Sequence, residues 1–383
     1  MKVTQIKDLV NSAMTQVLGE GALVEEDLSN VVDLGKQVID TNNLDNYVKA
    51  LVNHIGKVIF TERLYRGGVP SVLMDNWEFG SILEKVSTDL PEAQESDTWK
   101  LVDGKEYSQD VFHQPTVTVK LFNSKTTFEI PLSFSEKQVK ESFSNVNQLN
   151  GFLSMLQTAT QNSLTIKMDS LIMRTINNAI GETFVADLGA TPDFKKTGVK
   201  AVNLLKLYNE TVTTPVKHEE ALLNEGFLKF ASYTMGIYKD RLSKVSTLFN
   251  VGGKKKFTPS EDLHFVLLSD FAKASDVYLG SNTFHEENVS LPKYEAIPFW
   301  QGSGENYSFE DISSINVKTS SGKVVTTSGI LGVMFDTQAL GVSNLEQRVT
   351  TSYNAKAEFY TNYYKLDAGY FNDLNENFVV FFI

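Results

Sequence analysis

Few residues of this chain have the type and spacing that acid–base, nucleophilic or metal chemistry requires. Its 383 residues include no cysteine, which excludes disulfides, thiolate metal ligands and a cysteine nucleophile. The side chains that titrate near neutral pH are five histidines: His54, His113, His218, His264 and His285. The sequence patterns of serine hydrolases, phosphate-binding loops, dinucleotide-binding folds and zinc proteases do not occur. We therefore predict no catalytic residue and no cofactor-binding residue.

Two of the histidines stand before a pair of glutamates, a pattern that could supply metal ligands. These runs are His218-Glu219-Glu220 and His285-Glu286-Glu287. Because neighbouring residues do not share a helix face, each run supplies at most part of a coordination shell. Solvated surface charge is the simpler interpretation, and we predict no metal site.

The run Gly252-Gly253-Lys254-Lys255-Lys256 could touch a phosphate group. It lacks the following Ser or Thr and the helix start that a phosphate-binding loop requires. An exposed turn is the simpler interpretation, and in an assembly of copies this turn could meet acidic neighbours.

Charge and composition limit the classes of function. The net charge is −12, opposite in sign to that of a protein that grips nucleic acid through its phosphates. This charge suits a protein kept in solution by repulsion, and it equally suits the wall of a DNA container. The 25 Phe and 14 Tyr provide ample apolar area for a core and for subunit contacts. No apolar run approaches the ~20 residues that cross a bilayer, and the N-terminal residues lack a signal-peptide pattern, so we expect neither membrane insertion nor secretion.

The elements that must position these residues fall into five consecutive segments. We expect an N-terminal arm of short helices at 1–56, a long hairpin at 57–133, a long helix at 134–186, a mixed α/β lobe at 187–335, and returning strands at 336–383. A terminal apolar strand such as the one that ends this chain is normally tied into a sheet.

The hairpin segment carries more apolar side chains than so irregular a stretch can bury. It is acidic in its middle, and its end alternates in the manner of two strands around Asn123-Ser124. Long excursions with little regular structure are usually functional. An isolated copy would expose a set of apolar residues that predicts a partner surface. The set consists of Trp77, Phe79, Ile82, Leu83, Trp99 and Phe112.

The sequence of the helix segment predicts one long, continuous helix. Ser135 and Gln138 form a capping-box pattern, and no proline occurs between Leu132 and Thr191. Uninterrupted, the helix would reach ~70–75 Å at 1.5 Å per residue. Gly151 and the polar residues 158–163 are places where it could bend.

In this order, the segments resemble the major capsid proteins of tailed bacteriophages, which have the Hong-Kong-97-type α+β fold. Among these they are most similar to the capsid proteins of the small, short-tailed phages related to phi-29. The resemblance is carried by residues 51–60, 66–70, 79–93, 134–184 and 353–381.

The resemblance implies a structural protein and not an enzyme. Copies of the chain would self-assemble into the pentamers and hexamers of an icosahedral or prolate head that encloses double-stranded DNA without binding it specifically. The protein would belong to the virion and be assembled in the cytoplasm of the host bacterium. Its further partners would be a separate scaffolding protein and the portal and head-completion proteins.

The resemblance also implies a role for each segment. Residues 71–125 would be the extended loop that lies over a neighbouring subunit. Residues 134–186 and 336–383 would form the peripheral domain, and residues 187–335 the axial domain around the symmetry axes. A hinge that lets one chain fit both pentamers and hexamers could lie at Gly67 and Gly68, because glycine tolerates varied backbone angles.

Two other functions stay open on the sequence alone. An encapsulin-type compartment has the same fold but would hold protein cargo, so the contents of the particle distinguish it from a capsid. A soluble α/β enzyme or binding protein would form small oligomers, whereas a shell protein forms megadalton particles.

Overall fold

The computed structural model describes residues 11, 15, 70–74, 82–93, 95–96, 99–106, 112–135, 146–280, 293–300 and 313–383. The chain forms two compact units, each made of separate stretches. Unit 1 comprises Met1–Glu78, Lys125–Ile172 and Val342–Gly369, and unit 2 comprises Phe79–Ser124, Met173–Gly341 and Tyr370–Ile383. Apart from residues 11 and 15, the expected N-terminal arm lies outside the described residues, and so do Gly67 and Gly68.

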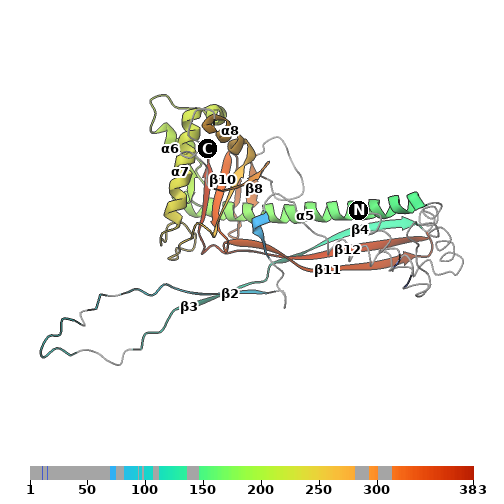
Figure 1. The fold of residues 1–383 in the computed structure, drawn as a ribbon, viewed down its shortest axis with the longest axis horizontal. Coiled ribbons are helices and arrows are strands. Elements are labelled where there is room, and N and C mark those ends of the chain that lie inside the picture. Colours follow the sequence, from blue (N-terminus) through green and yellow to red (C-terminus); the bar gives the residue numbers. More distant parts are fainter. Residues whose placement is uncertain are drawn as a thin grey trace. The chain divides into compact units, whose positions relative to one another are not determined.

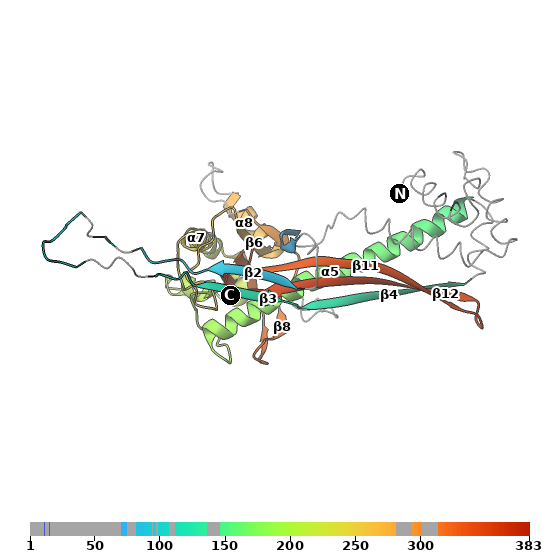
Figure 2. The same cartoon turned by 90° about the horizontal axis from the view of Figure 1, so that it is seen from below.

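A four-stranded sheet runs through unit 1 in the order β1-β11-β12-β4. Its strands are β1 (Leu73–Met74), β4 (Lys125–Ser135), β11 (Leu340–Asn354) and β12 (Phe359–Asn372). Figure 2 shows β4, β12 and β11 side by side as three long ribbons. Strand β12 is antiparallel to β4, and over most of its length fully buried and half-buried residues alternate. This period of two is the signature of a strand with two unlike faces.

The long helix α5 (Val146–Leu188) has 43 residues, which corresponds to roughly 65 Å. It begins in unit 1 and ends in unit 2, and it is drawn in green in Figure 1. Gly151 and residues 158–163 are helical, so neither interrupts it. The expected capping role of Ser135 is wrong, because Ser135 is the last residue of β4 and pairs with Phe359 of β12.

A five-stranded sheet forms the centre of unit 2 in the order β5-β13-β10-β6-β7. The strands are β5 (Ala201–Asn203), β6 (Leu263–Leu268), β7 (Glu295–Ile297), β10 (Ile330–Asp336) and β13 (Phe378–Phe382). The central strand β10 is antiparallel to both β13 and β6. Every residue of β10 and β13 is buried, as in strands that are covered on both faces.

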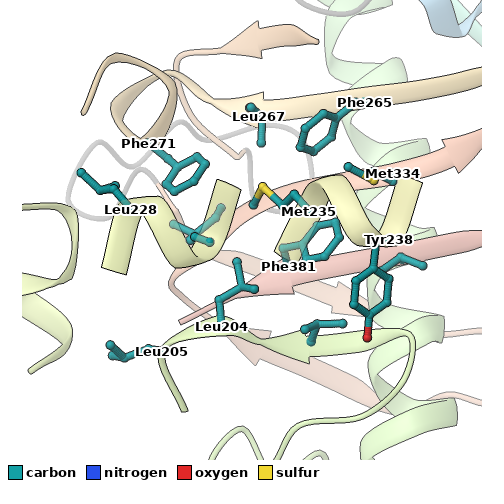
Figure 3. Packing of buried hydrophobic residues seen from close by; sticks show 14 of the residues in the cluster. Leu204, Leu205, Leu228, Met235, Tyr238, Phe265, Leu267, Phe271, Met334 and Phe381 are labelled. Atoms are coloured by element: carbon teal, nitrogen blue, oxygen red, sulfur yellow. The ribbon is translucent and has the colours of Figure 1, made fainter. Parts of the chain in front are cut away.

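Helices pack on this sheet and close the core of unit 2. They are α6 (Leu204–Asn209), the 3₁₀ helix η2 (His218–Leu223), α7 (Glu225–Leu242) and α8 (Ser269–Gly280). Asn224 caps α7 by accepting a hydrogen bond from the backbone N–H of Phe227 at 2.9 Å, as N-cap residues do. Figure 3 shows Leu228, Met235 and Tyr238 of α7 beside buried side chains of the strands. The labelled strand residues are Phe265, Leu267, Met334 and Phe381.

The closing strand of the chain lies in a different unit from most of β11 and β12. The sequence grouped residues 336–383 together, but Val342–Gly369 belong to unit 1 and Tyr370–Ile383 to unit 2. Residues 125–133, which the sequence grouped with the hairpin, lie in β4 of unit 1. Alternation of apolar residues identifies a strand but not its partner strand, which is why these boundaries were missed.

The remaining described elements are small. Strands β2 (Leu83–Thr88) and β3 (Val117–Phe122) form an antiparallel two-stranded sheet in unit 2. A second antiparallel pair consists of β8 (Ile315–Lys318) and β9 (Val324–Thr327), and the 3₁₀ helix η1 spans Pro70–Val72. None of the helices in the described part of the chain has both the length and the apolar character of a membrane span.

Candidate functional site at the hairpin

The hairpin, Leu83–Phe122, has two faces of opposite character. Leu83 lies opposite Phe122, and the register continues to Thr88 opposite Val117. Because neighbouring strand residues point to opposite sides, each strand contributes every second residue to a face. The outer face is exposed and consists of Glu84, Val86, Thr88, Val117, Val119 and Leu121. The inner face is half-buried and consists of Leu83, Lys85, Ser87, Thr118, Lys120 and Phe122.

The outer face therefore exposes apolar side chains that remain in contact with water in a single copy of the chain. Val86 and Val119 are directly opposite one another on the outer face, with 59% and 52% of their surface exposed. Leu121 on the same face is also exposed. Isolated exposed apolar residues are ordinary, but a group of neighbouring exposed apolar side chains, here Val86, Val119 and Leu121, marks an interaction surface.

Beyond the two strands, the described residues have no regular secondary structure and remain exposed. Figure 1 shows these segments running away from β2 and β3 as two thin traces. Trp99 is 76% exposed and Phe112 is 86% exposed. The described acidic residues here are Asp89, Glu92, Glu95, Asp103 and Glu106, against the basic residues Lys100 and Lys105. The loop thus combines aromatic rings with a net negative charge.

The residues that the sequence proposed for an interface divide into three groups. Trp77 and Phe79 lie outside the described residues. Ile82, Trp99 and Phe112 are exposed, and Leu83 is half-buried on the inner face. Sequence reasoning missed the valines and Leu121 of the outer face, although the alternation in the run VTVKLF could have located those of β3.

The inner face carries two lysines that lie directly opposite each other, Lys85 and Lys120. Like charges at such a position destabilise a sheet unless counter-charges intervene. Asp373 and Glu376, in the turn between β12 and β13, provide them. Lys85 Nζ lies 2.8 Å from Asp373 Oδ2 and 2.6 Å from Glu376 Oε1, and Lys120 Nζ lies 2.6 Å from Asp373 Oδ1.

A third lysine completes this charged cluster, which we define as Lys85, Lys120, Lys256, Asp373 and Glu376. Lys256 Nζ lies 2.8 Å from Glu376 Oε1. The two carboxylate side chains are only 3% and 5% exposed, so water does little to solvate them. Burial pushes the pKa of Asp373 upward, but hydrogen bonds from Lys120 and Lys85 outweigh burial and leave the pKa lowered. Asp373 is therefore ionised at neutral pH.

The turn that presents these carboxylates is itself held by backbone hydrogen bonds. The N–H of Glu376 donates to Asp373 O at 3.1 Å, and the N–H of Asp373 donates to Ala339 O at 2.6 Å. The N–H of Asn375 donates to Asp373 Oδ1 at 3.1 Å, a side-chain-to-backbone bond typical of Asp in turns. Gly252 lies so close that a Cβ there would meet Asn375 Oδ1 at 1.9 Å. The carboxylates consequently occupy fixed positions.

Two further contacts join the hairpin to the rest of unit 2. The rings of Phe122 and Phe371 are 5.0 Å apart between centroids, within the range of favourable aromatic pairs. Lys254 Nζ lies 3.5 Å from Asp89 Oδ1 in an exposed ion pair, which is worth little by itself.

A pocket of about 290 Å³ lies beside the charged cluster. The hairpin contributes Ser87, Thr88 and Thr118 to its lining, and the body of unit 2 contributes Lys256 and Asp336 among others. Burial raises the pKa of Asp336, against hydrogen bonds from the Gln338 N–H and the Thr258 hydroxyl.

The lysine run takes part in contacts within the chain. Lys254 and Lys256 are paired with carboxylates, as given above, and Lys255 is exposed. Gly253 has a φ of 64°, a left-handed conformation that favours glycine. The geometry is that of a turn.

The three histidines that the structure describes lie in separate segments. His218 lies in η2 and His264 in β6, where burial lowers its pKa. His113 is exposed, and His54 and His285 lie outside the described residues. Within the residues that the structure describes, no group of three or more His, Asp or Glu side chains is placed to hold a metal ion.

Comparison with known proteins gives both a family and a fold. The model of the Phi29-like phage major capsid protein family matches residues 10–382. No curated protein sequence matches the chain. The capsid structure of Staphylococcus phage Andhra is similar at a TM-score of 0.51 and 10% identity, covering 84% of this chain and 85% of that one. The capsid structure of the cyanophage P-SCSP1u is similar at a TM-score of 0.44 and 12% identity, covering 81% and 86%.

Proposed function

The chain belongs to the Phi29-like phage major capsid protein family, and we propose that it builds its shell by laying the outer face of the hairpin on a neighbouring copy. The family makes it a structural protein of the phage head, located in the virion, and not an enzyme. The expected Hong-Kong-97-type mixture of helix and strand is confirmed by the similarity to the capsid of phage Andhra. Copies of the chain assemble into the capsomers of the shell.

The observation that carries the proposal is that the hairpin turns charged side chains toward its own chain and apolar side chains toward solvent. Its lysines face the chain's own carboxylates, while Val86, Val119 and Leu121 face outward. Burying one such side chain contributes about 1.5–3 kcal/mol. A closed ring needs each copy to present one surface to its neighbour and to accept a different surface in return. We therefore take a neighbouring copy of the chain as the partner that covers the outer face of each hairpin.

The finer organisation of the head belongs to the same proposal. We expect pentamers and hexamers in an icosahedral or prolate head around double-stranded DNA, which the net charge of −12 leaves unbound. A separate scaffolding protein, a portal and head-completion proteins would complete assembly in the host cytoplasm. The supporting observation is the family itself.

Roles within the chain follow from the two units. We propose that the five-stranded sheet of unit 2 with α6, α7 and α8 forms the axial domain at the symmetry axes. The long strands of unit 1, together with α5, would form the peripheral domain. Gly67 and Gly68 stay proposed as a hinge between pentamer and hexamer forms. Changing both to valine should disturb shell closure and leave the chain folded, and normal particles from that variant would rule the hinge out.

The hairpin contact is tested by removing the apolar character of the outer face without breaking the strands. We predict that Val86→Thr, Val119→Thr and Leu121→Thr together weaken each contact between copies by about 3 kcal/mol, or more than ~100-fold. Threonine is retained because it favours strands. Assembly would be followed by light scattering and negative-stain microscopy.

The matched control is Val324→Thr, which makes the same change at a 63% exposed valine of β9. This control should assemble like the unchanged chain. Normal yields of closed particles from the triple variant, with its circular dichroism unchanged, would contradict the proposed contact.

A further inference from the structure

We infer that the charged cluster is a positioning site, which fixes the direction in which the hairpin leaves its own body and thereby selects the curvature of the shell. The inference rests on the proposed function, since the direction matters only if the hairpin binds a neighbour. It assigns an assembly role to Lys85, Lys120, Asp373 and Glu376.

The first support is that β2 and β3 form a sheet of two strands only. A two-stranded hairpin is marginally stable in water without further packing. Its inner face meets the body of unit 2 through three short ion pairs, a hydrogen bond from Lys85 Nζ to Gln338 O at 3.2 Å, and the contact of Phe122 with Phe371. Because β2 and β3 pair only with each other among the described strands, side-chain contacts hold the hairpin against β12 and the turn that follows it.

The second support is the burial of the carboxylates. Taking Asp373 and Glu376 out of water is costly unless cations replace the lost hydration. Two of the three cations come from the hairpin, one from each strand. If the hairpin swung away, Asp373 would lose both lysines and Glu376 would keep only Lys256 among the partners described. The cluster therefore favours one seated position over a continuous range of angles.

The third support is the length of the loop, which turns a small rotation at the strands into a large displacement of the tip. Residues 89–116 separate the two strands, so each arm of the loop can extend for at most about 45 Å at ~3.3 Å per residue. A rotation of about 10° at the strands would then move the tip by about 8 Å. This displacement is larger than the distance over which two side chains remain in contact. A small change at the cluster decides which part of a neighbour the tip reaches.

The test replaces the carboxylates and not the lysines. Lysines that lose their carboxylates can turn to water, because Lys85 and Lys120 are already 16% and 32% exposed, and Lys85 keeps its hydrogen bond to Gln338 O. Carboxylates that lose their lysines would stay buried. The variant is Asp373→Asn with Glu376→Gln in the full chain. The matched control is Glu219→Gln with Glu220→Gln, which removes two exposed charges from η2, outside the hairpin.

The first measurement is hydrogen–deuterium exchange of the unassembled chain. We expect the amides of β2 and β3 to exchange at least about tenfold faster in the carboxylate variant, while those of β6 and β10 keep their rates. The control should match the unchanged chain at both places. Unchanged exchange in the hairpin would overturn the inference, and so would an equal rise in β6 and β10, which would show that the cluster only stabilises the unit.

The second measurement is the shape of the assembled particles by electron microscopy. We expect open sheets or particles of mixed size from the carboxylate variant and uniform closed particles from the control. Uniform closed particles from a variant whose hairpin exchanges faster would also overturn the inference. Failure of the proposed function is recognised separately, because then the outer-face variant with three threonines would assemble normally whatever the cluster does.

Discussion

Asp373 and Asp336 belong to the same unit, yet the pKa values of their carboxyl groups move in opposite directions. Burial pushes both pKa values upward, and only Asp373 has two lysine hydrogen bonds that outweigh it. For a carboxylate with a lowered pKa, ionisation stabilises the folded state, and for one with a raised pKa it destabilises that state. The difference lies in the cations supplied by the hairpin.

This difference predicts how stability depends on pH. Asp373 has a folded-state pKa below its unfolded value, so its contribution is complete above about pH 4 and is lost as the pH falls through the folded pKa. Asp336 contributes with the opposite sign, because its folded pKa lies above the unfolded value. We predict that Asp373→Asn flattens the loss of stability below pH 4, as measured by thermal unfolding at successive pH values. An acid limb as steep as that of the unchanged chain would contradict this assignment.

The exposure of the hairpin residues could be predicted from the sequence in part, but their ion pairs could not. Exposure of Ile82, Trp99 and Phe112 follows from an apolar residue in an irregular stretch, and the structure has these three exposed. The charged cluster was not foreseen, because Lys85 and Glu376 are 291 positions apart and no local pattern joins them. The only local signal is a lysine on each strand at the face opposite the valines.

Among the elements, strands and helices were easier to predict than their partners. The long helix and the final apolar strand follow from the pattern of apolar residues. Which sheet each strand joins does not, because it depends on pairings between distant segments such as β13 with β5 and β10. The sequence consequently grouped residues 370–383 with 336–369, whereas the structure has Tyr370–Ile383 in unit 2; the mixture of helix and strand was correct.

The central strand of unit 2 allows a sharp test of its packing. A Cβ at Gly332 in β10 would lie 2.5 Å from Leu267 Cδ2 and 2.7 Å from the backbone O of Val266. We predict that Gly332→Ala lowers the free energy of unfolding by about 1–3 kcal/mol, because the neighbouring strand β6 cannot move aside. Chemical denaturation would measure the change.

The matched control is Gly236→Ala in α7, where a Cβ would meet no atom within 4 Å. Alanine favours a helix interior over glycine by about 1 kcal/mol, so this variant should be more stable than the unchanged chain. If both alanine variants shifted stability in the same direction, the close packing of β10 against β6 would be refuted.

For the whole molecule, assembly makes sense of features that look unfavourable in one copy. An apolar face exposed to water and a loop rich in aromatic rings are costs to an isolated chain. Under the proposed contact they become buried area between copies, repeated once for every copy. The sources of stability that the described residues display are apolar packing, hydrogen bonds and ion pairs within the chain.

The pocket beside the charged cluster has a pharmacological consequence. Its walls come from both the hairpin and the body, so it exists in this form only while the hairpin is seated. A small molecule that fills it would bind the seated form alone, and by mass action a hundredfold excess over its dissociation constant would favour that form by about 2.7 kcal/mol. Such a compound would stabilise the seated form of the hairpin in every copy.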